Sequence, residues 1–410
     1  MKLTSLLVGI LPLANLATAA PNDIEAEATK RVAKLTKQYQ KAIHDTIKHR
    51  KTGCTPKALL RRKEWYPSSP LYPHSAKPLR GTLSKKDRLS YINAVYCLAS
   101  KPPLTPPAII PGARSRYDDF VGAHIQQTDF VHNDGLFLGF HRTYVHLYEK
   151  ALREECGYTG AQPYWDSSIS YADPRNSTVF DGSPWSMGGN GVYIPNRPPT
   201  VIPLPDGSNL TFPAATGGGC IESGPFTADK FTIHLGPTGL PPQGPLGGLG
   251  YNPRCITRDL SPQLSEVCRP SNVSRLLETG DLAEFNFVLD RPNGIHGAGH
   301  FLMGLVAIDV FSAPNDPAFW LHHANVDRLW TIWQGLDLEG RVGQVWGTGT
   351  SLNGELRDCG IGVMLTCVLT VPPSPNVTLE STINFGVLSG PKKLGEVVSS
   401  VDGDFCYIYE

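Results

Sequence analysis

The stretch that decides the fold reads NGIHGAGHFLMG at residues 293–304 and APNDPAFWLHHANVDRLWTIW at residues 313–333. His296 and His300 are four residues apart, so on a helix they lie on one face, one turn apart. Two imidazoles placed in this way can bind one metal ion, and a third imidazole from a second helix would complete a three-nitrogen site. Neighbouring helical residues face about 100° apart, so only one of His322 and His323 can point inward.

A second group of histidines lies upstream, in VGAHIQQTDFVHNDGLFLGFHRTYVH at residues 121–146. His132 and His141 are nine residues apart, and nine residues of unbroken helix turn through roughly 900°, which would make them face opposite ways. We therefore expect the chain to break between them, at Asn133-Asp134-Gly135. His141 would then lie at the start of a new helix, and His124 would belong to the segment before the break.

The amino-acid composition limits the kinds of molecule that we expect the protein to bind. The 410 residues hold 37 basic and 37 acidic side chains, a balance that favours neither nucleic acid nor an anionic membrane as a partner. Residues 1–19 have the features of a secretory signal peptide, with Lys2, a short apolar run and a small-residue cleavage site. The run is too short for a membrane anchor. We expect one catalytic domain over 20–410 in a secreted, extracellular protein.

Cysteines and glycosylation triplets agree with that location. The nine cysteines should mostly form disulfides in an oxidising compartment, and because the number is odd at least one cannot pair within the chain. N-glycans are expected on two or three of four Asn-X-Ser/Thr triplets, which begin at Asn176, Asn209, Asn272 and Asn376.

Hydrophobic periodicity predicts helices separated by long loops. The 36 prolines and 41 glycines favour a modest regular core, and residues 174–250 in particular lack helical periodicity. Helices are expected at 24–50, 84–99, 141–155, 278–289 and 325–334, and β-like runs follow from Leu365 to the end.

Several motifs resemble those of the tyrosinase, catechol oxidase and haemocyanin family of paired copper centres. The resemblance covers nearly the whole chain after residue 50, is nearest to short secreted fungal members, and rests on FHR at 140–142, PYWD at 163–166, DPAFWLHHANVDRLW at 316–330 and YIY at 407–409. It implies a mainly α fold, with a central four-helix bundle that holds two copper ions, surrounded by long loops and a few short strands. Residues 66–82 are a departure, a possible extra loop between two family elements. The chain stops where the family's C-terminal blocking domain would begin.

The resemblance also implies which residues bind metal. It assigns one copper to His124, His132 and His141, and the other to His296, His300 and His323, because the family's ligand is the second histidine of the pair. The residues alone leave His296, His300 and His323 open to zinc or non-haem iron, although ligation by imidazole without carboxylate favours copper.

The expected reaction is oxidation of o-diphenols or o-aminophenols by dioxygen, which gives o-quinones or quinone-imines. Family members that also hydroxylate monophenols place an Asn directly after the first histidine of the second copper, and a Glu upstream, to position a water. Here the corresponding residues are Gly297 and Asp290, and Phe301 adds an apolar wall. A full tyrosinase is the alternative, and a haemocyanin-like dioxygen carrier or an inactive binding glycoprotein is disfavoured.

Other polar residues in these segments have simpler interpretations. His322 is expected to pack beside the site, His146 to point away from it, and His234 to lie in a strand. Asp327 either orients an imidazole or forms an ion pair with Arg142 or Arg328.

Overall fold

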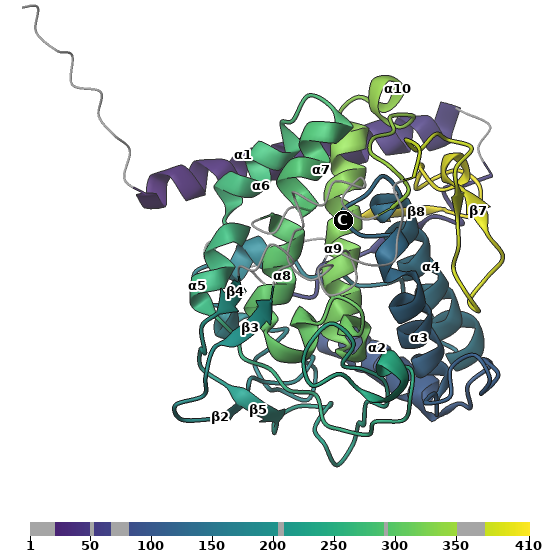
Figure 1. Cartoon of the computed structure of the whole chain (residues 1–410). Helices are drawn as coiled ribbons and strands as arrows, with labels where there is room; N and C mark the ends of the chain where they lie inside the picture. The colour runs from purple at the N-terminus through teal and green to yellow at the C-terminus, as the bar shows by residue number, and fades with distance from the viewer. Residues whose placement is uncertain (1–20, 50–52, 67–81, 204–208, 291–293, 351–373) are drawn as a thin grey trace, which may run out of the picture.

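The helices form a bundle with short strands at its edges, which confirms the mainly α prediction (Figure 1). The computed structural model describes residues 21–49, 53–66, 82–203, 209–290, 294–350 and 374–410. The described helices are α1 (Pro21–His49), α2 (Lys85–Ser100), α3 (Arg116–Gln127), α4 (Phe137–Cys156), α5 (Pro262–Ser265), α6 (Pro270–Leu277), α7 (Leu282–Asp290), α8 (Ile295–Met303), α9 (Ala318–Gly335) and α10 (Leu338–Arg341).

The strands are short and pair two by two. Parallel β1 (Leu60–Arg62) and β8 (Tyr407–Tyr409) join distant parts of the chain, and three antiparallel pairs lie elsewhere. These pairs are β2 (Gly191–Tyr193) with β5 (Gly218–Ile221), β3 (Thr200–Pro203) with β4 (Asn209–Phe212), and β6 (Thr382–Ile383) with β7 (Lys392–Lys393). Sheets this small depend on the helical core for their stability.

Helix α9 is the centre of the core, and every one of its residues is buried. It packs against α1, α4 and α8, and α1 crosses the bundle near the top of the view in Figure 1. A helix that is buried all round must find partners for its polar side chains as well as its apolar ones.

Asp327 shows how α9 meets that need. Its carboxylate accepts hydrogen bonds from Arg142 Nε at 2.7 Å and Arg62 Nη1 at 3.2 Å, and from the hydroxyls of Tyr407 and Tyr409 at 2.6 Å each. These donors and the two arginine charges hold its pKa below the ordinary value although burial opposes them. Of the two roles left open by the sequence, Asp327 therefore has the second: it forms an ion pair with Arg142 and does not orient an imidazole. Through Tyr407 and Tyr409 it also holds the C-terminal strand β8 against α9.

Two expected helix boundaries are wrong. The helix predicted over 278–289 begins only at Leu282, because the carbonyl of Thr279 accepts from Trp333 Nε1 and Arg341 Nη2 and Gly280 turns the chain. Helix α9 begins at Ala318, well before residue 325, because Asp316 Oδ1 accepts the first helical N–H at 2.9 Å.

Other local predictions are confirmed. Ser84 forms a capping box with Asp87 at the start of α2, and Gly157 ends α4 in the left-handed conformation with φ 67°. The predicted break before His141 is present, with Asn133 at φ 50°. Helix α4 begins at Phe137 and so includes one turn more than expected.

Disulfides join Cys54 to Cys406, Cys97 to Cys156, and Cys220 to Cys255. Cys268 is buried and free. Three predicted features lie outside the described residues. They are the signal peptide, residues 67–81 of the possible extra loop, and the two remaining cysteines, at positions 359 and 367. Among the helices that are described, none combines the length and apolar character needed to cross a bilayer.

Candidate metal centre

Three upstream histidines converge on one point. His124 comes from α3, His132 from the loop after η1 (Thr128–Phe130), and His141 from the first turns of α4. The Nε2 atoms of His124 and His141 are 3.4 Å apart, and the ring of His132 lies 4.8 Å from that of His141 and 5.1 Å from that of His124. All three side chains are buried.

Backbone carbonyls set the orientation of these three rings. Each ring donates its Nδ1–H to a carbonyl oxygen, which leaves the lone pair of Nε2 directed at the common point. The acceptors are Phe311 O for His124 at 2.8 Å, Thr128 O for His132 at 3.1 Å and Phe137 O for His141 at 2.9 Å. The sequence gives a signal for two of them, since Thr128 and Phe137 precede their histidines by four residues. Nothing in the sequence marks Phe311.

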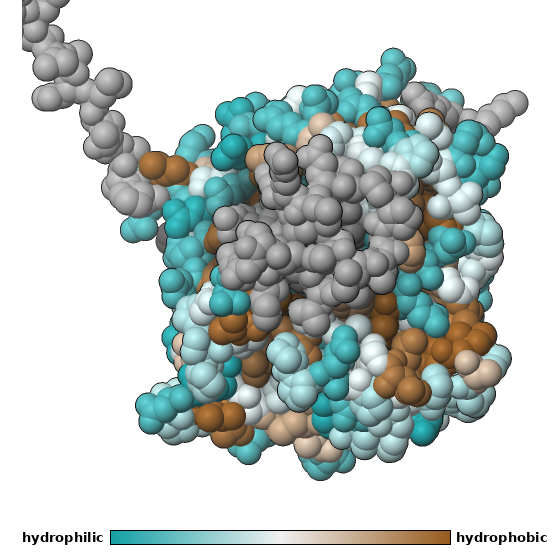
Figure 2. Space-filling view, viewed as in Figure 1, coloured by the Kyte–Doolittle hydropathy of each residue, from teal (hydrophilic) through white to brown (hydrophobic). Residues whose placement is uncertain are grey.

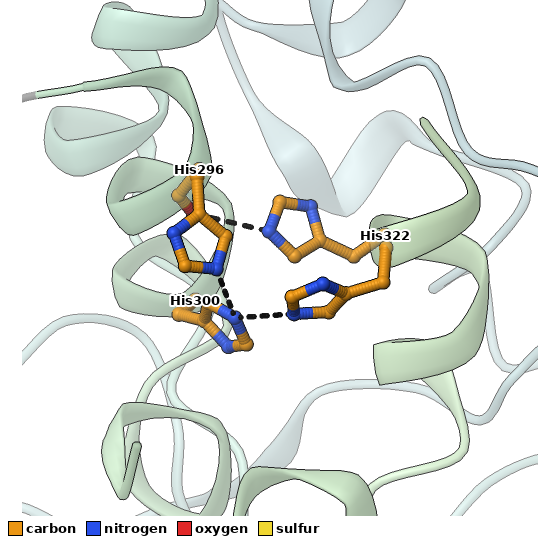
Figure 3. A group of neighbouring side chains, drawn as sticks. His296, His300 and His322 are labelled. Atoms are coloured by element: carbon orange, nitrogen blue, oxygen red, sulfur yellow. Dashed lines mark hydrogen bonds between the residues drawn. The ribbon is translucent and has the colours of Figure 1, made fainter. Parts of the chain in front are cut away.

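The downstream histidines form a second group of the same kind. His296 and His300 are one turn apart on α8, and His323 faces them from α9. His300 Nε2 lies 3.2 Å from His296 Nε2 and 3.1 Å from His323 Nε2. Figure 3 shows His296 and His300 turned toward the helix that carries His322.

His322 also lies within this group but is placed differently. The potential ligand atoms of all four histidines are within 4.8 Å of one another. The Nε2–H of His322 donates to the backbone carbonyl of His296 at 3.0 Å, however, so that nitrogen is occupied (Figure 3). Its ring also fills the space above Gly299, where a Cβ would lie 2.1 Å from His322 Cε1. His322 therefore packs α9 against α8, as the sequence predicted, whereas His323 brings its Nε2 to 3.1 Å from His300 Nε2.

The spacing of the Nε2 atoms fits a metal ion. Three nitrogens bound at 2.0–2.1 Å to one ion are separated from each other by about 3.3 Å. The observed separations of 3.1, 3.2 and 3.4 Å match this value. Neutral imidazoles that point their lone pairs at one another repel, and a cation between them removes that cost. The Nδ1 atoms of His300 and His323 have no hydrogen-bond partner among the described residues.

Burial keeps all six imidazoles neutral. Loss of solvation lowers the pKa of His132 to about 4 and that of His296 to about 3, and lowers the pKa of the other four well below its usual range. A neutral imidazole is the form that binds a metal ion.

The two groups are adjacent and face each other. The rings of His141 and His323 stack with centroids 4.3 Å apart, and those of His132 and His296 lie 6.3 Å apart. The two groups of histidines thus meet across the junction of α4 and α9.

Asp290 connects the two halves of the centre. Its Oδ1 accepts from His296 Nδ1–H at 2.7 Å, and its Oδ2 accepts the backbone N–H of Asn133, next to His132, at 3.0 Å. Burial raises the pKa of Asp290 to about 7, whereas the nearby His132 and the Asn133 bond lower it. Each oxygen of this carboxylate therefore accepts one hydrogen bond, and the side chain links His296 to the loop that carries His132.

A small apolar pocket opens onto the second group. His132, Asn133, Asp290, His296, Gly297, His300, Phe301, Ala307, Ile308 and Val310 line it. Phe301 is the largest apolar side chain of the lining, as expected, and Gly297 offers no side chain. The β3–β4 hairpin supports this wall, since the ring of Phe212 lies 4.7 Å from that of Phe301.

Two other histidines have structural roles. His234 does not lie in a strand; its Nδ1 bonds Asp118 Oδ2 at 2.8 Å, near the start of α3. His146 points away from the centre and packs edge-on against Phe405 with centroids 4.9 Å apart.

Residues 114–336 match the family model described as the common central domain of tyrosinase. This segment contains all six histidines of the two groups. The chain belongs to the tyrosinase family. Its mainly helical structure agrees with this assignment.

Relatives of known name support the family assignment along most of the chain. Tyrosinase P of Aspergillus terreus is 38% identical over 340 residues, which cover 80% of this chain and 90% of that protein. The tyrosinase-like protein orsC of Emericella nidulans is 43% identical over 320 residues, or 74% and 82%. The solved structure of a polyphenol oxidase mutant from Thermothelomyces thermophila is 39% identical with a TM-score of 0.75, and covers 95% of this chain and 97% of that one. This protein is thus an oxidase of the copper-dependent polyphenol oxidase class.

Proposed function

We propose that His124, His132 and His141 hold one copper ion and that His296, His300 and His323 hold a second, and that the pair oxidises o-diphenols and o-aminophenols with dioxygen. The observation that carries the proposal is the convergence of two buried groups of three neutral imidazoles, stacked 4.3 Å apart at His141 and His323. Donor sets of nitrogen without carboxylate suit copper.

Bound copper would supply a metal that changes between two oxidation states and so passes electrons from the phenol to dioxygen. Two molecules of o-diphenol then give four electrons and four protons to one dioxygen, which forms two o-quinones and two waters. The protein's part is to hold the rings rigid, to keep bulk water out and to place the substrate. Burial of the six imidazoles, and the Nδ1 hydrogen bonds of His124, His132, His141 and His296, serve the first two tasks.

The pocket residues would place the substrate. Phe301, Ile308 and Val310 form an apolar wall against which a flat ring can lie, and Gly297 leaves the side next to His296 open. The polar edge of the substrate would then face the metal positions. The small size of the pocket favours simple catechols and aminophenols over large polyphenols.

The same residues argue against hydroxylation of monophenols. The Asp290 carboxylate already accepts hydrogen bonds from His296 and Asn133, and its side chain is one methylene shorter than the Glu that positions the water in the family members that hydroxylate monophenols. Gly297 has no side chain that could hold that water in its place. We therefore infer that the chain oxidises o-diphenols and o-aminophenols but not monophenols.

Oxygen uptake by the copper-loaded protein tests this proposal directly. Catechol, 2-aminophenol and tyrosol should be compared side by side, with product formation followed by absorbance. The expected result is rapid turnover of the first two and none of tyrosol, whether or not a trace of catechol is added. Sustained turnover of tyrosol would indicate a full tyrosinase, and binding of dioxygen without turnover of any of the three would indicate a carrier.

We further propose that the protein is secreted and carries N-glycans at three sites. Three disulfides are typical of extracellular proteins. Asn176, Asn209 and Asn376 are exposed, whereas Asn272 is half-buried and its amide donates to Val267 O at 2.8 Å. Peptide mapping after deglycosylation of protein expressed in a fungal host should find sugar at the first three sites and none at Asn272.

A further inference from the structure

One face of α1 carries a continuous row of lysines. The row consists of Lys30, Lys34, Lys37, Lys41 and Lys48, all exposed, and His44 fills the gap before the last of them. Successive members are three or four residues apart, which places them on one face of the helix at intervals of about 4.5–6 Å. The lysine row is about 27 Å long. The overall charge balance of the chain conceals this local excess.

The opposite face of α1 is fixed to the protein. Val32, Tyr39, Ile43 and Ile47 are buried in the main core, and α1 packs against α6 and α9. The hydroxyl of Tyr39 also accepts the backbone N–H of Tyr409 at 3.0 Å. The helix therefore cannot rotate to disperse its charges, and the lysine row is presented outward along one side of the molecule, where α1 crosses the bundle (Figure 1).

The lysine row carries few counter-charges, since Asp45 is the one acidic side chain between Lys30 and Lys48. Like charges at i and i+4 weaken a helix, whereas carboxylates at those positions strengthen it. Within the described part of the chain only Lys30 has an ion-pair partner, Glu27 at 3.7 Å, and both side chains are largely exposed. No ion pair is formed there by Lys34, Lys37 or Lys41. The arrangement costs stability locally, and a bound polyanion would offset that cost.

The shape of the surface suits a linear ligand. The row lies on an open surface formed by α1 itself, with Lys30, Ala33, Lys34, Lys37, Gln38 and Lys41. Figure 2 shows hydrophilic and hydrophobic residues mixed over the face seen in Figure 1. The pocket at the two histidine groups is lined by residues of α7, of α8, of the loop that carries His132 and of the segment after α8, and includes none of α1.

We propose that the lysine row is a docking surface for a linear anionic polysaccharide, one with a carboxylate on each sugar. Such a polymer offers negative charges at a spacing of about 5 Å, which matches the rise between successive lysines. Single-stranded nucleic acid fits less well, because the aromatic side chain of α1, Tyr39, is buried and offers no stacking surface. An anionic membrane fits less well too, because the apolar face of α1 is already occupied by the core and cannot enter a bilayer.

The test compares binding of the whole copper-loaded protein to polygalacturonate, to neutral dextran, to single-stranded DNA and to vesicles with anionic lipid, each over a range of salt concentrations. The row variant combines Lys34→Gln, Lys37→Gln and Lys41→Gln, which preserve helix propensity. The matched control removes the same charge elsewhere with Lys57→Gln, Lys86→Gln and Lys230→Gln, all at exposed positions.

We expect the wild-type chain to bind polygalacturonate in a salt-dependent way and to leave dextran free. The row variant should bind polygalacturonate roughly tenfold more weakly, since each exposed charge contributes modestly, while the control variant binds like wild type. Catechol oxidation by both variants should equal that of wild type, which separates this surface from the proposed reaction. Any of three results would overturn the proposal. They are an equal loss of polygalacturonate binding in both variants, no binding of polygalacturonate by wild type, and tighter binding of wild type to DNA or to vesicles than to polygalacturonate.

Discussion

Replacement of Asp290 by Asn tests how the two halves of the centre are held together. The Asp290 carboxylate accepts from His296 Nδ1–H at 2.7 Å and from the Asn133 N–H at 3.0 Å. An amide keeps the shape of the side chain but loses the charge, and only one of its two ends can accept. Loss of a carboxylate that orients a metal-bound imidazole typically lowers metal affinity by about 10- to 100-fold, or about 1.4–2.7 kcal/mol.

The assay is competition for copper between the protein and a chelator, with the copper that remains on the protein measured by atomic emission. Asp290→Asn should lose copper at about a tenth or less of the chelator concentration that wild type withstands. Asp119→Asn is the matched control, because Asp119 is also buried and its two oxygens accept backbone N–H groups, from Leu104 at 2.8 Å and from Thr105 at 3.1 Å, rather than a histidine. Equal copper retention by wild type and Asp290→Asn, or equal loss by the control, would refute this account of Asp290.

Three further substitutions probe the surroundings of the centre. Burial lowers the pKa of His146 to about 4, so the folded protein loses stability as the pH falls from 6.5 toward 4 and the buried imidazole becomes protonated. His146→Leu should remove up to about 3 kcal/mol of this loss. Chemical denaturation of wild type and variant at pH 7 and at pH 4 measures it. Phe301→Ala removes the wall supported by Phe212 and should raise kcat/KM for 4-tert-butylcatechol relative to catechol by roughly tenfold, and an unchanged ratio in steady-state assays would place the substrate elsewhere. Gly299→Ala would set a Cβ 2.1 Å from the His322 ring and should cost about 1–3 kcal/mol of unfolding free energy in calorimetry, whereas a variant as stable as wild type would show that the ring moves freely.

Spacing rules predicted the local placement of some of the histidines, and the family resemblance implied the two sets of three. The four-residue interval between His296 and His300 placed both on one helix face, and the nine-residue interval before His141 required the break that Asn133 provides. Helix periodicity is local, so such intervals can be read from the sequence. The choice of His323 over His322 needed the family resemblance, and the structure supplies a physical reason in the bond from His322 to the His296 carbonyl.

Features that depend on distant contacts could not be predicted. The sequence left the role of Asp327 open, because its partner Arg142 comes from another helix, 185 residues away. The helix predicted from residue 278 fails for the same reason, since Trp333 and Arg341 take the carbonyl that would have continued it. The acceptor for His124, the carbonyl of Phe311, is likewise a long-range contact without a sequence signal.

The central claim is that two metal ions lie side by side between the two groups of histidines. Anomalous scattering from crystals of copper-loaded protein, recorded on both sides of the copper absorption edge, tests it most directly. The account predicts two copper peaks roughly 3.5–4 Å apart, one among the Nε2 atoms of His124, His132 and His141 and the other among those of His296, His300 and His323. A single peak, or a peak bound by His322 in place of His323, would contradict it.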